Sequence, residues 1–386
     1  MYKRQGQGFA DSGINFIKAE ALNGDSALDP KGIFYITEDV QQKLKRSILQ
    51  EDDVLLTIAG ARIGKCGIVN SSHLPANTNQ AVGIMRVDRS KADPRYLYYW
   101  FKQKRTYAFV QGLNAQAAQP NINLSMLKNI ELPLPRIGKQ KEIASILSAY
   151  DDLIENNRRR IQLLEQSARL LYKEWFVHLR FPGHEHVKII DGVPDGWEKK
   201  NAFEAMEVLS GGTPKTTIPA YWDGDIPFFT PKDAVDCAYA FETEKTITEE
   251  GLRNCNSRLY PKDTVFITAR GTVGNINLAQ TAMAMNQSCY ALVAKAPLNQ
   301  YYLYFALVEG VEQFRSRAVG AVFDAIIRDT FKLIPFVVPD EKLISMFTDH
   351  VSPILNQIDV VASQTRKLSD ARDLLLPRLM NGEVAV

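Results

Sequence analysis

Apolar residues recur at alternating steps of four and three along two stretches of the chain. The first stretch runs from Ile143 to Trp175 and the second from Phe347 to Leu379, and each position of the second lies 204 residues after its counterpart in the first. A period of 3.5 residues is that of a helix that buries one narrow seam against another helix. The pattern therefore predicts two long, packed helices. The expected seam residues are Ile143, Leu147, Ile154, Asn157, Ile161, Leu164 and Leu171 in the first helix and Ile358, Val361, Thr365, Leu368 and Leu375 in the second.

The polar seam residues indicate how the two helices run. An antiparallel arrangement places Asn157 opposite Thr365, so that two uncharged polar side chains meet, whereas a parallel one sets Asn157 against Val361. A buried amide without a hydrogen-bond partner is disfavoured, so the pattern favours antiparallel packing. Pro353 and Pro377 are expected to kink or break the second helix because proline has no N–H to donate.

The remaining parts of the chain repeat at a similar displacement. Short alternating runs predict strands at 53–58 and 264–269, and each leads into a turn that contains glycine. Asp53 answers Asp263 at the start of these strands. Each copy is therefore expected to be a mixed α/β domain. Further matched features of the two copies are Gly64 and Gly274, Asn79-Gln80 and Asn286-Gln287, and the aromatic helix-like stretches 95–101 and 301–307.

The repeat predicts an α+β chain in which two similar α/β domains are separated by two long helices that form an antiparallel coiled coil. The central helix is expected from Lys139 to Phe176. The expected boundaries are 1–137 for the first domain, 138–180 for the central spacer helix, 181–338 for the second domain and 339–386 for the last helix.

The two copies are not equally complete. The first copy has no counterpart of a segment that includes 195–198 and 210–215, and its opening residues match nothing in the second copy. We therefore expect the amino terminus of the first domain to be incomplete or aberrant, with a natural short form as the less favoured alternative.

Composition excludes several classes of protein. The chain has 386 residues, of which 45% are hydrophobic and 23% charged. It contains no apolar run long enough to cross a membrane, and no basic start followed by an apolar core, so a cytoplasmic location is expected. The four cysteines are far apart and form no CxxC pair, which argues against a zinc site and a disulfide framework.

Charge is distributed unevenly between the two copies. The formal net charge is only +2, yet residues 1–138 carry 18 Lys and Arg against 12 Asp and Glu, whereas 181–338 carry 15 against 19. A protein that held nucleic acid by phosphate neutralisation alone would be much more basic. If the chain binds DNA, a partner must supply much of the positive charge.

This two-copy layout resembles the specificity subunit of type I DNA restriction-modification systems. The resemblance covers the chain from about Ile14 onward and is far more specific than any single motif. The segments that carry it are 132–176, 339–383, 210–233, 269–274 and 286–288.

The resemblance implies a non-catalytic subunit that recognises a DNA sequence. In this family each target recognition domain reads one half of a bipartite site in double-stranded DNA, and the helices act as a spacer. Modification (methyltransferase) and restriction (helicase-nuclease) subunits dock onto the complex and do the chemistry. No cofactor is expected on this chain, while S-adenosylmethionine, ATP and Mg are expected on the partner subunits.

Two other functions remain as alternatives. A self-contained nuclease or methyltransferase of the restriction class is disfavoured because the motifs for these reactions are missing; Asp195 and the segment 198–200 supply nuclease-like residues but lie too close together. A coiled-coil scaffold for ligands other than DNA would lose ground if any duplex bound specifically. No catalytic or metal-binding residue is expected.

Residues of the glycine turns and the Asn-Gln pairs are the first candidates for DNA contact. A cation and backbone amides on a tight turn can approach a phosphate closely, although turn stability or domain packing explains these residues equally well. The Asn-Gln pairs could bond adenine edges, but their recurrence in two domains that read different sequences favours a structural or phosphate role. These candidates are Arg62, Lys65, Arg270 and Thr272 on the turns and Asn79, Gln80, Asn286 and Gln287 in the pairs.

Sequence specificity is expected where the two copies differ. The amide-rich stretch 114–123 stands opposite the quite different 320–328, although an ordinary polar loop explains any single residue better. The basic cluster after 95–101 is a further candidate, with a solvated helix face as the alternative. The remaining candidates are Lys102, Lys104, Arg105, Gln116, Gln119, Asn121, Thr213, Lys215, Lys232 and Arg328.

Overall fold

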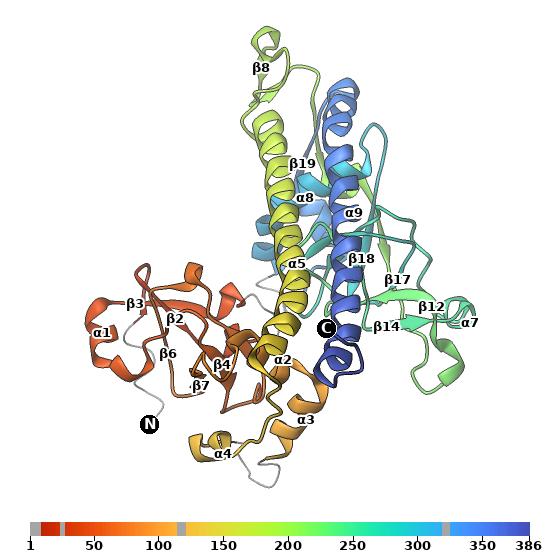
Figure 1. Cartoon of the computed structure of the whole chain (residues 1–386). Helices are drawn as coiled ribbons and strands as arrows, with labels where there is room; N and C mark the ends of the chain where they lie inside the picture. Colours follow the sequence, from red (N-terminus) through yellow and green to blue (C-terminus); the bar gives the residue numbers. More distant parts are fainter. Residues whose placement is uncertain (1–8, 24–27, 114–120, 319–324) are drawn as a thin grey trace. The chain divides into compact units, whose positions relative to one another are not determined.

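The computed structural model describes residues 9–23, 28–113, 121–318 and 325–386. Contacts divide the chain into two compact units (Figure 1). The first unit joins Met1–Asn156 to Thr365–Val386, and the second unit is Asn157–Gln364. Each unit therefore holds one globular domain and one half of each long helix.

Among its described residues the first unit contains two small sheets and four short α-helices. Its four-stranded sheet has the order β1-β3-β2-β6, with strands Phe9–Ala10 (β1), Ile33–Ile36 (β3), Ile14–Ile17 (β2) and Ala76–Thr78 (β6). The second sheet, β5-β4-β7, is built from Cys66–Ile68 (β5), Val54–Thr57 (β4) and Val82–Met85 (β7). The helices are Glu38–Lys43 (α1), Pro94–Lys102 (α2), Lys104–Gly112 (α3) and Leu124–Lys128 (α4).

The second unit has the same plan with more strands. Its five-stranded sheet, β11-β18-β15-β16-β13, contains Met206–Ser210 (β11), Cys289–Ala294 (β18), Val265–Thr268 (β15), Ile276–Ala279 (β16) and Tyr239–Ala240 (β13). A three-stranded sheet, β14-β12-β17, contains Lys245–Ile247 (β14), Trp222–Phe229 (β12) and Ala284–Met285 (β17). Two strand pairs complete it: Ile189–Ile190 (β8) with Val193–Pro194 (β9), and Glu198–Asn201 (β10) with Pro335–Val338 (β19). The helices are Ala202–Ala205 (α6), Glu249–Arg253 (α7) and Gln300–Ala318 (α8).

The predicted strands at the start of the repeat are confirmed, but one residue match was wrong. Asp52 and Asp263 both have φ of +67° immediately before β4 and β15, so Asp263 corresponds to Asp52 and not to Asp53. The turn after β4 is one residue longer than the turn after β15, because Thr57 N–H bonds the carbonyl of Lys65 whereas Thr268 N–H bonds that of Asn275. The displacement between the two copies therefore falls by one residue across this turn, from 211 between Asp52 and Asp263 to 210 between Gly64 and Gly274.

Each domain also places an aromatic helix in the same way. Asp93 caps α2 by accepting a 3.0 Å hydrogen bond from Tyr96 N–H, and Asn299 caps α8 by accepting one of the same length from Tyr302 N–H. The Tyr96 hydroxyl then donates to the carbonyl of Pro133 at 3.2 Å, while the Tyr302 hydroxyl donates to that of Val337 at 3.0 Å. The repeat thus extends from sequence to individual hydrogen bonds.

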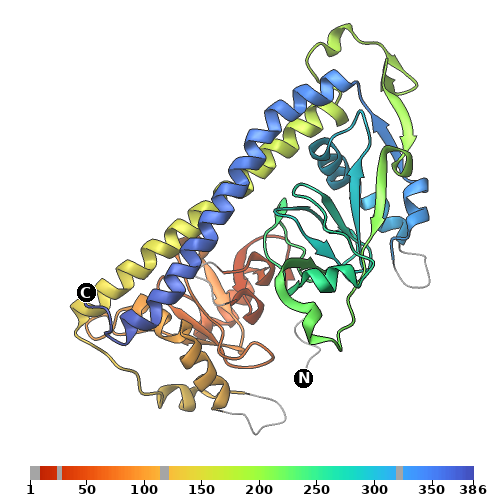
Figure 2. The ribbon, with the colours of Figure 1, turned by 90° about the vertical axis from the view of Figure 1, so that its right-hand side faces the viewer.

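The two long helices are Ile137–Tyr172 (α5), which ends in a π-helical turn at Lys173–Val177, and Glu341–Met380 (α9). In the first unit the early part of α5 meets the late part of α9, because Arg372 bonds Asp151. In the second unit the Trp175 and Phe347 rings lie 6.1 Å apart, just after the end of α5 and near the start of α9. Figure 2 shows the last part of α5 running beside the first part of α9. Antiparallel packing is therefore confirmed within each unit.

The twelve residues of the predicted seam divide between buried and half-buried positions. Six of its residues are buried, whereas the others are half-buried because the buried stripe drifts onto neighbours such as Tyr172 and Leu376. Asn157 and Thr365 belong to different units, and their pairing stays a prediction. The buried seam residues are Ile143, Leu147, Ile154, Ile161, Ile358 and Val361, and the half-buried ones are Asn157, Leu164, Leu171, Thr365, Leu368 and Leu375.

The expected break of α9 at its prolines was wrong. α9 is continuous through Pro353 and Pro377. Val351 and Leu355 are buried on either side of Pro353, so packing holds the helix where one hydrogen bond is lost. No helix in the described part of the chain is long and apolar enough to cross a membrane.

Candidate nucleic-acid interface

Four loops of the second unit meet at the ends of its strands. Gly212 N–H, just after β11, bonds the carbonyl of Met285 at 3.1 Å, and the Thr213 hydroxyl donates to the side-chain oxygen of Gln287. The Thr272 hydroxyl, on the turn after β15, donates to the Pro231 carbonyl at 3.4 Å. The candidates Thr213, Thr272 and Gln287 therefore form hydrogen bonds between neighbouring loops, and their side chains are exposed.

The described part of the first unit repeats this arrangement except for the loop after β11, which has no counterpart there. Its turn after β4 is fixed to the loop after β2, because the Arg62 guanidinium donates to the Glu20 carbonyl at 2.9 Å. The next connection is shared as well: Ile122 N–H bonds the Ile58 carbonyl at 2.8 Å, and Ile326 N–H bonds that of Ala269 at 3.0 Å. Both domains thus share these connections on a similar framework.

The Asn-Gln pairs divide into a structural residue and an exposed one. The Asn79 side-chain oxygen accepts a 3.1 Å bond from Ala81 N–H, and Asn286 accepts a 3.0 Å bond from Ser288 N–H. These Asx turns supply the structural role that recurrence favoured. Gln80 and Gln287 are exposed beside them.

Exposed cations border the loops of the second unit. Burial raises the pKa of Tyr290, and the nearby positive charges of Arg270 and Arg328 oppose that rise. Arg328 also lies 5.3 Å from the centre of the Phe203 ring, and Lys232 forms a 3.5 Å ion pair with Glu244. Lys215 is exposed on the loop after β11.

One basic candidate was wrong. Lys102 has a side chain that is only 8% exposed, and its Nζ lies 3.7 Å from the Asp151 carboxylate. A lysine buried against a carboxylate cannot reach a phosphate, so Lys102 belongs to the core of the first unit. Lys104 and Arg105, at the start of α3, are exposed.

The remaining candidates of the first unit have mixed positions. Lys65 is half-buried, with Nζ 5.1 Å from the centre of the Tyr107 ring. Asn121 is exposed and pairs through its backbone with Ala59. Gln116 and Gln119 lie outside the described residues.

On the loop after β12 the sequence indicated Lys232 but not the residue that holds the loop in shape. Asp233 is buried there, and its carboxylate accepts bonds from the backbone N–H and the hydroxyl of Thr230 at 2.7 and 2.6 Å. This capped turn sets the position of Pro231, which Thr272 contacts. The sequence of residues 230–233 (TPKD) could have predicted this turn, since threonine followed three residues later by aspartate is typical of a capped turn.

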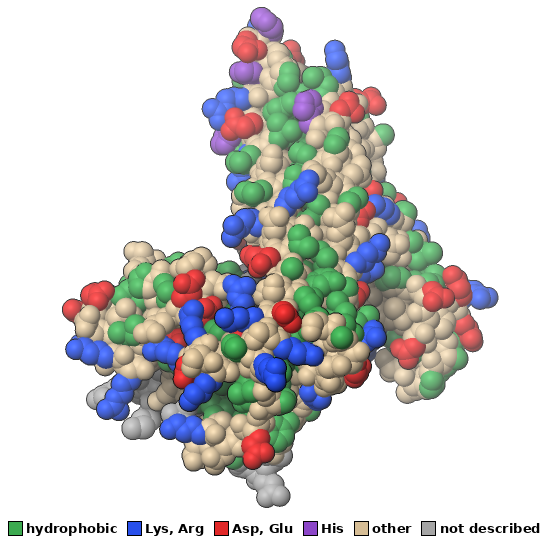
Figure 3. All heavy atoms as spheres, viewed as in Figure 1, with side chains coloured by type: hydrophobic (Ala, Val, Ile, Leu, Met, Phe, Trp, Pro, Cys, Tyr) green, Lys and Arg blue, Asp and Glu red, His purple; other side chains and the backbone are tan. Residues whose placement is uncertain are grey.

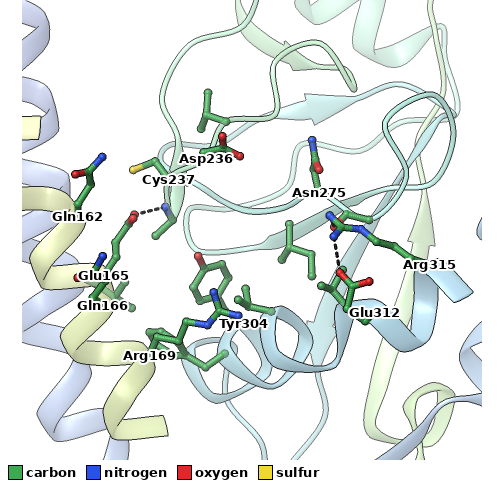
Figure 4. Close-up of a pocket in the computed structure, with 18 residues that line it drawn as sticks. Gln162, Glu165, Gln166, Arg169, Asp236, Cys237, Asn275, Tyr304, Glu312 and Arg315 are labelled. Atoms are coloured by element: carbon green, nitrogen blue, oxygen red, sulfur yellow. Dashed lines mark hydrogen bonds and ion pairs between the residues drawn. The ribbon is translucent and has the colours of Figure 1, made fainter. Parts of the chain in front are cut away.

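The second unit also has a cavity of about 610 Å³ between α5, α8 and the β16 region (Figure 4). Its charged side chains are already engaged: Glu165 accepts a hydrogen bond from Ala238 N–H, and Arg315 forms a 2.6 Å ion pair with Glu312. Burial raises the pKa of Glu165, and it raises the pKa of the Cys237 thiol to about 12. Within the described residues no group of His, Cys, Asp and Glu could hold a metal ion.

Surface charge differs between the two units. Figure 3 shows Lys and Arg side chains spread over the visible face of the first unit. The surplus of 18 basic over 12 acidic residues in 1–138 accounts for this. Such a face can attract a polyanion, although the net charge of +2 limits the attraction of the whole chain.

Comparisons with known proteins agree on one family. Residues 6–166 and 194–358 each match the type I restriction modification DNA specificity domain. The MjaIX specificity subunit of Methanocaldococcus jannaschii is 27% identical over 365 residues, which cover 91% of this chain and 82% of that protein. The HindI specificity subunit of Haemophilus influenzae is 23% identical over 327 residues, which cover 69% and 71%.

A solved structure shares the fold. The crystal structure of the type I restriction-modification S subunit from M. genitalium aligns with a TM-score of 0.58 at 16% identity, covering 97% of this chain and 91% of that one. At this identity the likeness concerns the fold alone.

Proposed function

The chain belongs to the family of type I restriction-modification DNA specificity proteins, and from this premise we propose that each of its two domains reads one half of a bipartite duplex target. It is a recognition subunit and not itself a catalyst. The observation that carries the proposal is that both domains repeat the turn after β4 or β15, its bond to the loop after β2 or β12, and the Asn-Gln turn. One framework displayed twice suits two half-sites whose sequences differ.

The loops contain residues that are the same in both domains and residues that differ between them, and we assign the two kinds different roles in binding. Asn79 and Asn286 hold the turns in shape, so they serve both domains alike. Arg62 corresponds to Thr272. The two side chains differ in charge, but each donates a hydrogen bond to the equivalent loop of its own domain, after β2 or after β12. We assign phosphate contact to the exposed cations around the turns and base contact to exposed positions where the domains differ, because backbone contacts fix register and base edges carry sequence.

The proposal requires partners. A net charge of +2 is small for gripping a duplex, so modification subunits are proposed to dock on this chain and to add phosphate contacts. They would hold S-adenosylmethionine, and restriction subunits would add ATP- and Mg-dependent cutting. In this assembly the chain selects the site and orients the catalytic subunits.

Competition binding tests the proposal. The chain is purified with its modification subunits, and a library of random duplexes is selected for retention. We expect enrichment of one sequence in two short blocks with an unread gap. Enrichment of a single continuous block would contradict two-domain reading.

A matched pair of variants locates the surface. Arg270→Ala removes an exposed cation from the turn after β15, and Lys342→Ala removes an exposed cation from the start of α9. Loss of one phosphate contact should weaken binding about tenfold for Arg270→Ala and lower its salt dependence. Lys342→Ala should bind like the parent, and equal losses in both variants would contradict the assignment.

A further inference from the structure

Three exposed cations of the second unit gather around one aromatic ring, that of the half-buried Phe203. Their charged groups are the Lys295 Nζ, the Arg328 guanidinium and the Lys332 Nζ. These groups lie 5.8, 5.3 and 5.5 Å from the centre of the ring. Like charges repel one another, so a bound anion would stabilise this arrangement. We name Phe203 together with these three cations the Phe203 cluster.

Three segments that are far apart in the sequence build the Phe203 cluster. Phe203 lies on α6, and Lys295 follows β18 and donates a 3.0 Å hydrogen bond to the Phe203 carbonyl. Arg328 and Lys332 lie on the 3-10 helix Arg328–Leu333, which packs against α6. The buried Phe331 fixes this helix on the core. The backbone of the second unit therefore places all three cations beside the ring.

The cluster keeps an excess of positive charge. Lys332 forms a 2.8 Å ion pair with Asp329. The Glu204 carboxylate lies on α6 but accepts a 3.0 Å hydrogen bond from the backbone at the start of that helix. Within the described residues no carboxylate forms an ion pair with Lys295 or Arg328. Two of the three cations can therefore bind an anion without first leaving a carboxylate.

This concentration of positive charge contrasts with the rest of the second domain. Residues 181–338 carry 15 Lys and Arg against 19 Asp and Glu, so the domain as a whole does not attract a polyanion. Attraction must come from local clusters of cations. The first domain has a basic surplus instead, and it has Leu124 and Ser125 at the positions 204 residues before Arg328 and Asp329.

The Phe203 cluster is continuous with the loops of the candidate nucleic-acid interface. The Ala269 N–H donates to the Ser288 carbonyl at 2.8 Å, and the Ala269 carbonyl accepts a 3.0 Å bond from the Ile326 N–H. Ala269 thus joins the turn that carries Arg270 to the Asn-Gln turn on one side. On the other side it joins that turn to the segment that leads into Arg328. The same framework therefore holds the loops and the cluster.

We propose that the Phe203 cluster binds phosphates of the DNA backbone next to the bases that the loops of the second domain read. The cations of Lys295, Arg328 and Lys332 donate charge-assisted hydrogen bonds to the phosphate oxygens. The Phe203 ring attracts the cations before DNA arrives, so less side-chain freedom is lost on binding. The inference rests on the proposed function and adds a contact that fixes the second domain on its half-site.

The test measures binding of the chain, in complex with its modification subunits, to the duplex that this complex selects. The double variant Lys295→Ala, Arg328→Ala should weaken binding about tenfold or more and lower the salt slope by about two, one for each lost contact. The selected sequence should stay the same, because phosphate contacts carry no sequence information. Lys342→Ala removes an exposed cation at the start of α9 and should bind like the parent.

Asp329→Asn should change binding in the opposite direction. It removes the carboxylate that pairs with Lys332 and keeps the size of the side chain, so Lys332 becomes available to a phosphate. We expect binding that is about threefold tighter or more and a steeper salt slope. Misfolding could not produce such a gain. The matched control is Glu174→Gln, which releases Arg180 from a 2.7 Å ion pair away from the cluster and should bind like the parent.

Duplexes with single neutral methylphosphonate linkages locate the contact. The parent should lose affinity at one or two linkages, and the double variant should lose none there, because its contact is already missing. A selective parent with a double variant of equal affinity and salt slope overturns this inference and leaves the proposed function standing. So does weaker binding of the modification subunits by the double variant without DNA, because the cluster would then contact a protein. A parent complex that selects no duplex overturns both.

Discussion

The Arg372 guanidinium donates a 2.6 Å hydrogen bond to the Asp151 carboxylate, and the two side chains are 5% and 4% exposed. The Tyr99 hydroxyl donates to the same carboxylate at 2.7 Å, and Lys102 lies 3.7 Å from it. Burial alone would lower the pKa of Arg372, but its bonds to Asp151 raise it. This pair ties α5 to α9 inside the first unit.

The second unit replaces this polar cluster with apolar residues. The positions that correspond to Asp151 and Arg372, at a displacement of 204, are Leu355 and Ala168, and both are buried. Removing one partner of a buried pair leaves an uncompensated charge. We therefore expect Asp151→Ala to destabilise the first unit by about 3–5 kcal/mol.

Lys102 corresponds to Val308, because α2 and α8 align at a displacement of 206. The combined variant Asp151→Leu, Arg372→Ala, Lys102→Val therefore introduces the residues of the second unit at all three positions. Without buried charge it should lie within about 1–2 kcal/mol of the parent. Amide exchange of the first unit in guanidinium series measures both changes. A triple variant as unstable as Asp151→Ala would show that the cluster is needed for more than charge balance.

Exchange of the second domain should change one half of the target. Residues 195–335 are replaced by the corresponding domain of another family member, while the helices and the first domain are kept. Each domain has its own core, so the graft should fold. Mapping of methylated sites should show one new half-site and one unchanged half-site. Simultaneous change of both halves would count against modular reading.

The helix pair is expected to set the gap between half-sites. α5 has 36 residues and so spans about 54 Å, or about 16 base pairs, and the width of each domain should reduce the unread gap to about 5 to 9 base pairs. One heptad added to both helices at matched seam positions adds about 10 Å and should lengthen the gap by about 3 base pairs. A heptad in α5 alone is the control and should disrupt packing. A matched insertion with an unaltered gap would show that the helices are not the ruler.

Thiol reactivity should follow burial. Burial raises the pKa of the Cys66 thiol from 9.0 to about 12, so at pH 8 its thiolate fraction is about a thousandfold lower than that of an ordinary cysteine. Alkylation of the native chain should therefore modify the half-buried Cys255 first and Cys66 only after unfolding. Mass spectrometry of the alkylated chain measures the order. Rapid native modification of Cys66 would contradict the packing of the first core.

Much of the fold could be read from the periodicity of the chain. Burial drives the seam, so Leu147 and Ile358 could be placed from spacing alone. The buried ion pair could not be placed from spacing. Arg372 lies on the four-and-three pattern, where an apolar residue is expected, and its partner Asp151 lies 221 residues away. Lys102 was mistaken for a DNA contact for the same reason.

The segments that precede the two long helices show a second limit of local pattern. Apolar residues alternate in a similar way in 129–135 (NIELPLP) and 333–339 (LIPFVVP), yet only the second segment contains a strand. A strand exists where another strand pairs with it, and β10 has no counterpart in the described first unit. Recurrence of the Asn-Gln pairs in two domains is visible in sequence, and it favoured the kind of structural role that the turns of Asn79 and Asn286 supply.

Base-resolution mapping of methylation tests the central claim most directly. The chain is incubated with a genome and S-adenosylmethionine, first alone and then with its modification subunits. The account predicts no methylation by the chain alone and, with the partners, methylation of one sequence in two blocks separated by a fixed gap. Methyl transfer by the homogeneous chain, or sites that form one uninterrupted block, would contradict it.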